Sequence, residues 1–423
     1  MRHKRINCLL CCVLLMARFP AQAQEIKGIV FDNRVYDEAV AGLKVSVSGA
    51  HCAPLVISLD GNQCFHIVFD DLDARLRDLK YTLIHCNFKW EPTPDFPRSE
   101  YLSGFEEGYI SDYAYSMNTA QHYLTYRFSL PNEDMQWRKS GNYLLCVYED
   151  EDHPLFTYRL MVAEEKVSIL PEFQASTNIP EHLTHQEARF QVKPKGIRLL
   201  NPSQTVKVLL MQNQRADNAL LLSKPYAQQG DVLLYDKPGA ITMPGGSEFH
   251  RFNMRSMVRT LENVRQIHRT EDSYHVYVYP DPDRSRLPYV SETDVNGCCL
   301  LLSDTEALAS DLDYARVHFE WRYDRPLDGE VYVFGELTHW RFLEEAKMQY
   351  RPDLHAYTAS LYLKAGYYNY TYVFVPRNSA FASFFADGSH WETENSYTFL
   401  VYYHPDGTDY DRLIGYKQTF FKP

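Results

Sequence analysis

A stretch between residues 81 and 148 decides the fold. It begins with YTLIHC at 81–86 and ends with GNYLLCVY at 141–148, two short segments rich in aromatic and branched apolar residues. Segments of this length and composition, bounded by Asn, Pro and Gly, predict β-strands. Between them, Trp and Tyr residues are interspersed with Asn, Pro and Gly, which predicts an irregular excursion between two β-arms.

The same strand pattern recurs along the chain. In YLTYRFSL at 123–130, every second residue from Leu124 is apolar, and the residues between are mostly polar, as in a half-buried antiparallel strand. Helical spacing is rare, and 304–312 has the best example, with Asp304 near its start. The chain is therefore predicted to be all-β. Further predicted strands lie at 45–47, 55–59, 65–69, 158–163, 188–193, 205–211 and 274–279.

The chain has 423 residues, which is more than one hydrophobic core normally serves. A strand ends near residue 163 and Glu164-Glu165-Lys166 opens a new segment, while a proline-rich exit and an acidic stretch precede residue 315. We expect three β-sandwich modules of immunoglobulin-like type in series. Their predicted ranges are 24–164 for the N-terminal module, 165–302 for the middle module and 303–423 for the C-terminal module.

Residues 1–23 have the pattern of a secretory signal peptide. A basic start with Arg2, Lys4 and Arg5 precedes an apolar run and then Ala21-Gln22-Ala23, which predicts cleavage after Ala23. The apolar run is too short for a transmembrane helix. A lipoprotein signal at Cys11 or Cys12 is the alternative, but Leu10 stands where a small residue is needed. We expect an exported, periplasmic protein without a membrane span of its own.

Charge excludes one class of partner. The formal net charge is −12, and after loss of residues 1–23 the remaining 39 basic and 55 acidic residues give −16. An excess of negative charge disfavours nucleic acid and anionic lipid as partners. We expect neither.

Six cysteines remain after the predicted cleavage, at positions 52, 64, 86, 146, 298 and 299. Their spacing forms no dense disulfide framework and contains no CxxC motif. Cys86 and Cys146 lie on the two β-arms, at a separation compatible with a bridge across a sandwich. The favoured alternative is two buried thiols that act as small hydrophobic side chains.

The sequence lacks the motifs of common enzymes, including GxSxG, HExxH, a P-loop and a dinucleotide fingerprint. His182 and His185 lie in an irregular segment and are poor metal ligands. Asp70-Asp71 and Asp281-Pro282-Asp283 have the composition of hydrolytic or calcium-binding acids, but such pairs also serve in turns. We predict no catalytic residues, no metal and no cofactor.

Aromatic residues make up 14% of the chain, and Tyr dominates with 32 residues. Tyr and Trp on surface loops are typical of protein–protein contacts. Trp90, Tyr101 and Phe105 are the leading anchor candidates in the excursion, and a compact loop folded on its own side chains is the alternative. The aromatic cluster of the excursion comprises Phe88, Trp90, Phe96, Tyr101, Phe105, Tyr109, Tyr113 and Tyr115.

This region contains the separated motifs YTLIHCN at 81–87, Trp90, Ser116, Asn118-Thr119, Leu130-Pro131-Asn132 and SGNY at 140–143, and the C-terminal part adds LKAGYYNY at 363–370 and DGSHWETEN at 387–395. Together these motifs resemble the type IX secretion system plug proteins of the Bacteroidota, and the two C-terminal motifs extend the resemblance over nearly all of the mature chain. Lys-Ala-Gly in place of Lys-Gln-Gly and Trp391 in place of Tyr are local departures. The resemblance implies a partner, the outer-membrane translocon barrel, whose channel the protein closes from the periplasm when no substrate is exported.

The C-terminal module carries a second resemblance. VYVFGELTHW at 331–340, followed by strand-like segments at 357–364 and 366–374, resembles the early-set sandwich of glycogen-binding modules. Such modules stack exposed tryptophans on sugar rings. An alternative function is therefore glycan binding in the envelope through Trp340 and Trp391, while the favoured interpretation of Trp340 is an anchor at a strand end.

Overall fold

The computed structural model describes residues 26–48, 50, 52–271, 273–302, 309–378, 383 and 385–423. Strands dominate these residues, and the α-helices α1 (Arg98–Tyr101) and α2 (Pro202–Thr205) are one turn each. The all-β prediction is confirmed. The predicted signal peptide at 1–23 lies outside the described residues. So does most of the predicted helix at 304–312, whose described end is a 3-10 turn, η2 (Ala309–Asp311).

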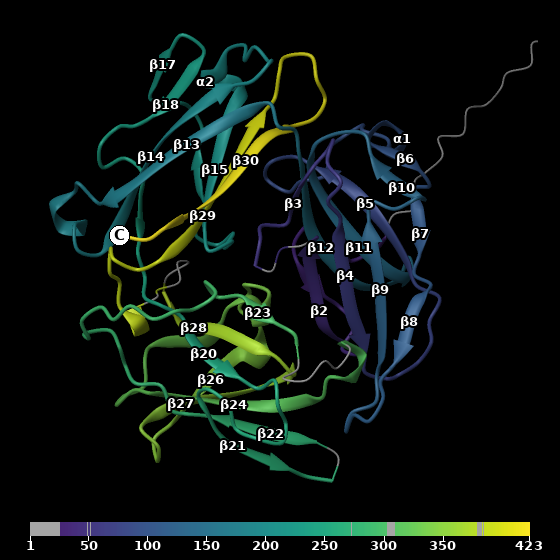
Figure 1. Cartoon of the computed structure of the whole chain (residues 1–423), viewed down its shortest axis with the longest axis vertical. Coiled ribbons are helices and arrows are strands. Elements are labelled where there is room, and N and C mark those ends of the chain that lie inside the picture. Colours follow the sequence, from purple (N-terminus) through teal and green to yellow (C-terminus); the bar gives the residue numbers. More distant parts are fainter. Residues whose placement is uncertain are drawn as a thin grey trace, which may run out of the picture.

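Module 1, residues 26–164, is a sandwich of two sheets (Figure 1, purple and blue). One sheet has the order β1-β12-β11-β5-β7, with β3 parallel to β12; the other has the order β2-β4-β9-β8, and β10 pairs β6 in a ribbon. The strands are β1 (Arg34–Val35), β2 (Val40–Val47), β3 (Val56–Ser58), β4 (Phe65–Asp71), β5 (Lys80–Cys86), β6 (Leu102–Gly104), β7 (Glu107–Tyr109), β8 (Asp112–Tyr115), β9 (Leu124–Leu130), β10 (Met135–Trp137), β11 (Gly141–Asp150) and β12 (His153–Ala163).

The two predicted β-arms are β5 and β11, which pair with each other. Their register sets Tyr81 opposite Val147 and Cys86 opposite Asn142. Because side chains alternate along a strand, Leu83 of β5 faces inward and joins Ile67 of β4 in one core between the sheets. The predicted excursion is the segment that joins these arms, and it contributes β6, β7 and β8 to the margin of the sandwich.

The structure excludes a disulfide between Cys86 and Cys146. Both residues lie in one sheet, and their register places them four positions apart along neighbouring strands. Four residues span about 13 Å of strand, whereas a disulfide joins Cα atoms about 4.4–6.8 Å apart. Both are free, buried thiols, and burial raises the pKa of Cys86 to about 12.

Module 2 is also a two-sheet sandwich (Figure 1, teal and yellow). One sheet has the order β13-β14-β18-β17, with β19 on β14, and the other has the order β16-β15-β29-β30. Apolar side chains of both sheets fill its core, including Phe190, Val208 and Phe399. The elements are β13 (Val167–Ala175), η1 (Ile179–Glu181), β14 (His185–Pro194), β15 (Val206–Gln212), β16 (Leu220–Leu222), β17 (Ala227–Gln229), β18 (Val232–Tyr235), β19 (Thr242–Pro244), β29 (Asn395–Tyr403) and β30 (Arg412–Phe421).

Module 3 is a sheet of nine strands that wraps around one core (Figure 1, green). Its order is β20-β28-β25-β26-β27-β24-β22-β21, with β23 on β28. The elements are β20 (His250–Asn253), β21 (Val264–Arg269), β22 (Tyr274–Val278), β23 (Cys299–Leu300), β24 (Tyr314–Arg322), β25 (Gly329–Phe334), η3 (Glu336–Thr338), η4 (Glu344–Ala346), β26 (Lys347–Arg351), β27 (Ala356–Lys364), β28 (Tyr367–Pro376) and η5 (Phe385–Asp387).

The predicted division at residues 302 and 303 does not follow the sheets. Strands β20, β21 and β22 belong to module 3, and β29 and β30 return to module 2. Strand β15 carries the apolar residues Val206, Val208 and Leu210. It pairs in antiparallel register with residues 397–403 of β29, which are also largely apolar. Module 3 is thus inserted within module 2. A strand pattern in the sequence shows that a strand exists, but not which strand it pairs with.

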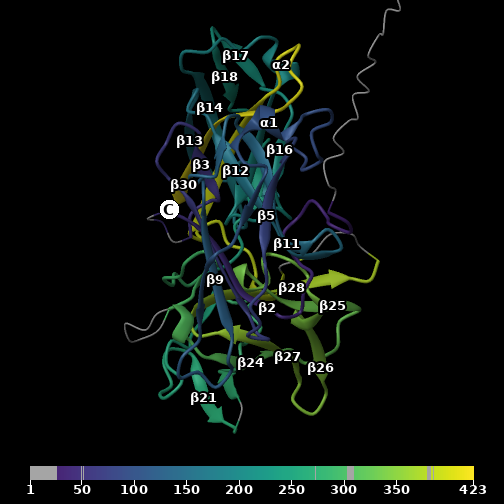
Figure 2. The same cartoon turned by 90° about the vertical axis from the view of Figure 1, so that its right-hand side faces the viewer.

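The three modules form one body. Figure 2 shows β2 of module 1 running down to module 3, where Lys44 Nζ lies 2.5 Å from a carboxylate oxygen of Glu336. Between modules 1 and 2, Arg412 donates two hydrogen bonds, of 2.9 and 2.6 Å, to the carboxylate of Glu164. Met161 of module 1 also packs with apolar side chains of module 2. These contacts fix the modules relative to one another.

Candidate functional site: the aromatic edge of module 1

Strands β7 and β8 are the terminal strands of the two sheets of module 1, on the same side of the sandwich (Figure 1, right). Among the described residues, β7 pairs only with β5, and β8 pairs only with β9. The chain passes from one sheet to the other through Ile110, which is buried and donates its backbone N–H to Leu79 O. A terminal strand presents unpaired backbone groups along its outer side, which is a common site for partner binding.

Large apolar side chains project from this margin. Tyr113 and Tyr115 are two positions apart on β8 and share a face, and their rings meet edge to face with centroids 6.3 Å apart. Isolated exposed apolar residues are common, but a group in one place marks a candidate contact site. We call this group the aromatic edge; it consists of Phe105, Tyr109, Tyr113, Tyr115 and Met117, which are between 41% and 68% exposed.

Backbone geometry sets Phe105 outward. Gly104 has φ +94°, and a Cβ built on it would lie 2.1 Å from the carbonyl oxygen of Asp134. The next residue, Phe105, donates its N–H to that same oxygen at 2.7 Å. A side chain at position 104 would therefore force the ribbon β6–β10 apart, and glycine is required for this close approach. The ring of Phe105 remains 66% exposed.

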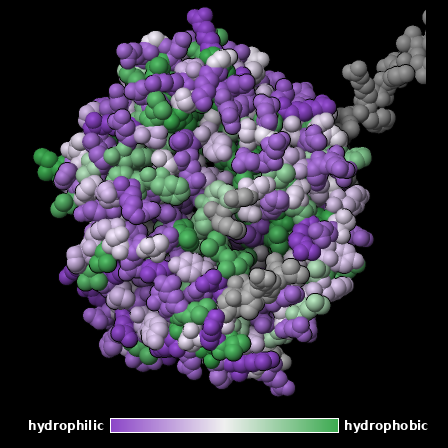
Figure 3. All heavy atoms as spheres, viewed as in Figure 1, coloured by the Kyte–Doolittle hydropathy of each residue, from purple (hydrophilic) through white to green (hydrophobic). Residues whose placement is uncertain are grey.

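Charged side chains surround the aromatic edge and are mostly paired. Lys80 Nζ lies 5.6 Å from the ring centre of Tyr109, and Arg127 lies 3.3 Å from Asp112. Figure 3 shows hydrophilic and hydrophobic residues interspersed over the face in that view. Apolar rings within a polar margin have the composition of protein–protein contact sites.

The structure separates the three predicted anchors. Tyr101 is only 3% exposed and donates its hydroxyl to Leu83 O at 3.2 Å, so it belongs to the core of module 1 and is wrong as a surface anchor. Trp90 packs against the apolar cluster between modules 1 and 2, with the Arg159 guanidinium 4.7 Å above its ring. It is inward-facing because the turn around it contacts module 2, where Asp411 accepts the N–H of Phe88. Phe105 alone among the three is largely exposed.

Tyr109, Tyr113 and Tyr115 were part of the aromatic cluster in the sequence, but nothing distinguished them there as anchors. The available signal was the two-residue spacing of Tyr113 and Tyr115, which places both rings on one face of a strand. Whether that face was buried depended on the position of β8 at the end of its sheet, which the spacing does not reveal.

The two candidate sugar-binding tryptophans do not form a common platform. The ring of Trp340 packs edge to face on Phe334, at 5.5 Å between centroids, and against Gly297, where a Cβ would come within 2.3 Å of the indole. Trp391 packs on the core of module 2 near Phe421. Neither lines the cavity of about 350 Å³ at the junction of modules 2 and 3. Both are partly buried, and each packs against the apolar side chains of its own module.

Comparison with known proteins identifies the family. A family model described as Type 9 secretion system plug protein 1st domain matches residues 40–164, which covers nearly all of module 1 and its aromatic edge. The chain belongs to the plug protein family of type 9 secretion. A hypothetical protein from Parabacteroides merdae, known from a crystal structure, is similar to this plug-family protein along almost its whole length. The two share 31% identity and a TM-score of 0.88, over 93% of this chain and 100% of the other. No curated protein matches significantly.

The acidic pairs of this plug-family protein serve structural networks. Asp281 accepts hydroxyl hydrogen bonds of 2.6 Å from Tyr370 and Tyr372, and its second oxygen lies 2.9 Å from His250 Nδ1. Asp387 lies 2.7 Å from the other ring nitrogen of His250. Burial lowers the pKa of His250, but the two carboxylates outweigh it and raise the pKa to about 9. This ion cluster holds module 3 together.

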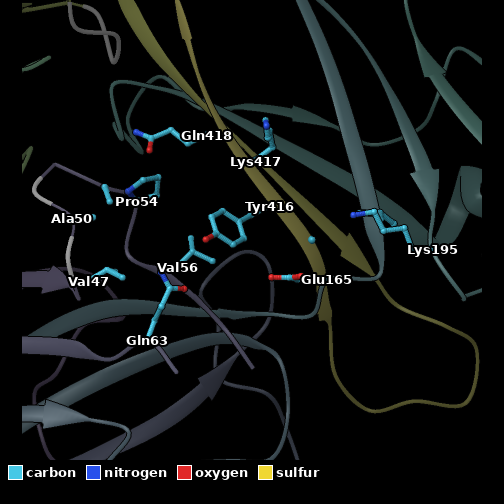
Figure 4. Close-up of a pocket in the computed structure, with 13 residues that line it drawn as sticks. Val47, Ala50, Pro54, Val56, Gln63, Glu165, Lys195, Tyr416, Lys417 and Gln418 are labelled. Carbon is cyan, nitrogen blue, oxygen red and sulfur yellow. The ribbon is translucent and has the colours of Figure 1, made fainter. Parts of the chain in front are cut away.

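A cavity of about 440 Å³ lies between modules 1 and 2 of the plug-family protein. In Figure 4, Tyr416, Val56 and Glu165 lie near the middle of the view, with Pro54 on one side and Lys195 on the other. These residues come from β3 and the segment before it, from the linker after β12, from the segment after β14 and from β30. The aromatic edge, by contrast, gathers exposed apolar side chains at one margin of module 1, and we take it as the candidate functional site.

Along the described part of the chain, no helix has the length and apolar character needed to cross a membrane.

Proposed function

We propose that this plug-family protein docks on the periplasmic side of the outer-membrane translocon of type 9 secretion and closes its channel when no substrate is exported. Family membership gives the protein a role in type 9 secretion. The observation that carries the docking proposal is the aromatic edge within the family-matched region, where Phe105 and Tyr109 are 66% and 68% exposed. We also propose a periplasmic location, supported by the signal-peptide pattern at 1–23.

A protein that closes a channel must keep its modules in fixed relative positions while it is bound to the translocon. Buried ion pairs across the module junctions supply this property, because separating the modules would expose or isolate the charges of Lys364 and Asp70, which lie 2.5 Å apart and are almost fully buried. We propose a non-enzymatic role, supported by the structural use of Asp70 and Asp281 in these networks.

Docking is tested with a triple variant of the aromatic edge, Phe105→Ala, Tyr109→Ala and Tyr115→Ala. A true anchor contributes about 2 kcal/mol or more to binding, so loss of one such side chain weakens binding about 30-fold. The measurement is copurification of the translocon barrel with the tagged plug-family protein. Because the three rings are exposed, the unfolding temperature should change little.

The matched control is Ile179→Ala with Leu183→Ala, which removes two exposed apolar side chains from module 2. This variant should copurify the barrel normally. Normal copurification by a folded triple variant refutes the aromatic edge as the contact site.

Plugging is tested in a deletion strain. Uptake of a large hydrophilic antibiotic across the outer membrane should rise, because the translocon channel is left open, while substrate export continues in part. The wild-type gene should restore the barrier, the control variant should restore it, and the triple variant should not. An unchanged barrier with the translocon present contradicts a plugging role.

A further inference from the structure

The three modules meet at a pair of cysteines. Cys52 precedes β3 in module 1, Cys298 precedes β23 in module 3, and Gln214 follows β15 in module 2. Gln214 Nε2 donates to Cys52 O at 2.6 Å and lies 4.0 Å from Cys298 Sγ. The thiol of Cys298 is also in side-chain contact with Cys52. Two thiols from different modules, 246 positions apart in the chain, are thus already adjacent.

We propose that Cys52 and Cys298 form a disulfide that joins module 1 to module 3 when the protein enters an oxidising compartment. Both are free thiols in this structure. The proposal goes beyond channel closure and rests on the proposed periplasmic location only for the source of oxidant.

Other pairings are less favourable among the described cysteines. Cys86 and Cys146 are too far apart along their sheet, as shown above. Cys64 Sγ instead donates to the carbonyl oxygen of Pro131 at 3.8 Å, within module 1. Cys299 shares this surrounding, since its N–H donates to Glu336 at 2.7 Å and its sulfur lies 3.9 Å from Lys44 Nζ, but the thiol in side-chain contact with Cys52 is that of Cys298.

Exposure gives the two thiols different roles. Cys52 is partly exposed and has φ +59°, in the segment before β3, so an oxidant reaches it first. Cys298 is only 4% exposed. Its contact with Cys52 and its burial raise the pKa of the Cys298 thiol, while the Lys44 ammonium acts in the opposite direction. Cys298 is therefore placed as the resolving thiol, which needs access to Cys52 but not to solvent.

The reaction is a thiol–disulfide exchange with a disulfide-bearing oxidant, either a protein or oxidised glutathione. The Cys52 thiolate attacks one sulfur of the oxidant, forms a mixed disulfide and releases the other sulfur as a thiolate. The Cys298 thiolate then attacks the Cys52 sulfur, and the second oxidant sulfur leaves. Two protein thiols lose two electrons and two protons, and the oxidant disulfide is reduced to two thiols.

The test uses the purified mature protein without the translocon. The reduced protein is equilibrated with mixtures of oxidised and reduced glutathione, free thiols are alkylated, and peptides are analysed by mass spectrometry. We expect alkylated cysteines to fall from six to four and a cross-linked peptide to contain Cys52 and Cys298. The oxidised protein should unfold about 6 °C higher than the reduced protein, because the bridge closes a long loop in the unfolded chain.

Cys52→Ser and Cys298→Ser should each abolish the cross-link and the shift in unfolding temperature, and Cys64→Ser, at another partly exposed cysteine, should keep both. Cys52→Ser alone suffices if the buried Cys298→Ser variant does not fold. Six alkylated cysteines at every glutathione ratio, or a bridge that includes Cys64 or Cys299, overturns the proposal. Neither result affects channel closure, which is measured separately in cells.

Discussion

Replacement of Asp70 by Asn should destabilise the protein severely through an isolated charge between modules 1 and 3. Asp70 is fully buried, and one carboxylate oxygen accepts hydrogen bonds from Lys364 and Tyr314, both at 2.5 Å. The other oxygen accepts the hydroxyl of Thr125 at 2.6 Å. Burial already lowers the pKa of Lys364, although Asp70 opposes this. Without Asp70, the Lys364 ammonium loses the carboxylate with which it forms an ion pair, and Asp311 is left as a nearby negative charge.

The expected loss follows from these contacts. Breaking a buried ion pair on one side costs about 3–5 kcal/mol. Neutralising a lysine at pH 7 costs about 4.6 kcal/mol from its ordinary pKa, which sets an upper limit because Lys364 can lose its proton instead. If it does so, the unfolded state binds one more proton than the folded state. The stability of Asp70→Asn should therefore rise with pH, by about 1.4 kcal/mol per unit between pH 7 and 10.

Urea denaturation of Asp70→Asn, Lys364→Met and the double variant measures the effect. The double variant should be more stable than Asp70→Asn, because it removes the isolated ammonium. The control is Asp353→Asn, whose partner Arg351 is exposed, and this should change stability by less than about 1 kcal/mol. The reasoning is refuted if Asp70→Asn lowers the free energy of unfolding by less than about 1 kcal/mol. It is also refuted if Asp70→Asn causes the same loss in the wild-type protein and in the Lys364→Met variant.

Two further predictions concern stability. Burial lowers the pKa of His250, but Asp281 and Asp387 outweigh it and raise the pKa in the folded protein to about 9. Protonated His250 therefore contributes fully to the free energy of unfolding below its ordinary pKa of about 6.5, and this contribution is lost as the pH rises through about 9. This contribution is about 3 kcal/mol, and thermal unfolding across pH 6–10 should show the decline in the wild type but not in His250→Gln. Tyr101→Ala should cost about 3–5 kcal/mol and Phe105→Ala less than about 0.5 kcal/mol in urea denaturation, and equal costs would contradict the different burial of the two rings.

The local pattern of the sequence predicted strands well, because alternation is a property of neighbouring residues. In β9, Leu124 and Tyr126 are buried as predicted. Thr125, on the predicted polar face, is also fully buried, since that face lies against module 3 and its hydroxyl bonds Asp70. Alternation indicates two faces, but it does not indicate that a second module covers one of them.

The candidate site was predicted only in part. The excursion holds the aromatic edge, but of the three predicted anchors only Phe105 is largely exposed. The composition of a loop does not determine the direction of each ring, which depends on contacts with distant residues. Trp90 lies against side chains of module 2, and Tyr101 donates its hydroxyl to the backbone oxygen of Leu83 in β5. The insertion of module 3 was missed for the same reason, since it depends on pairing between β15 and β29.

That insertion has a consequence for the order in which the protein folds. Strand β15 ends at Gln212, and its neighbour β29 begins only at Asn395, so module 2 cannot complete its second sheet until almost the entire chain has emerged. Contacts between such distant residues slow folding, and the apolar side of β15 stays uncovered meanwhile. Module 3, whose strands lie between these two segments, can close first and bring the ends of module 2 together. A chain interrupted before β29 would keep a folded module 3 beside an open, aggregation-prone sheet.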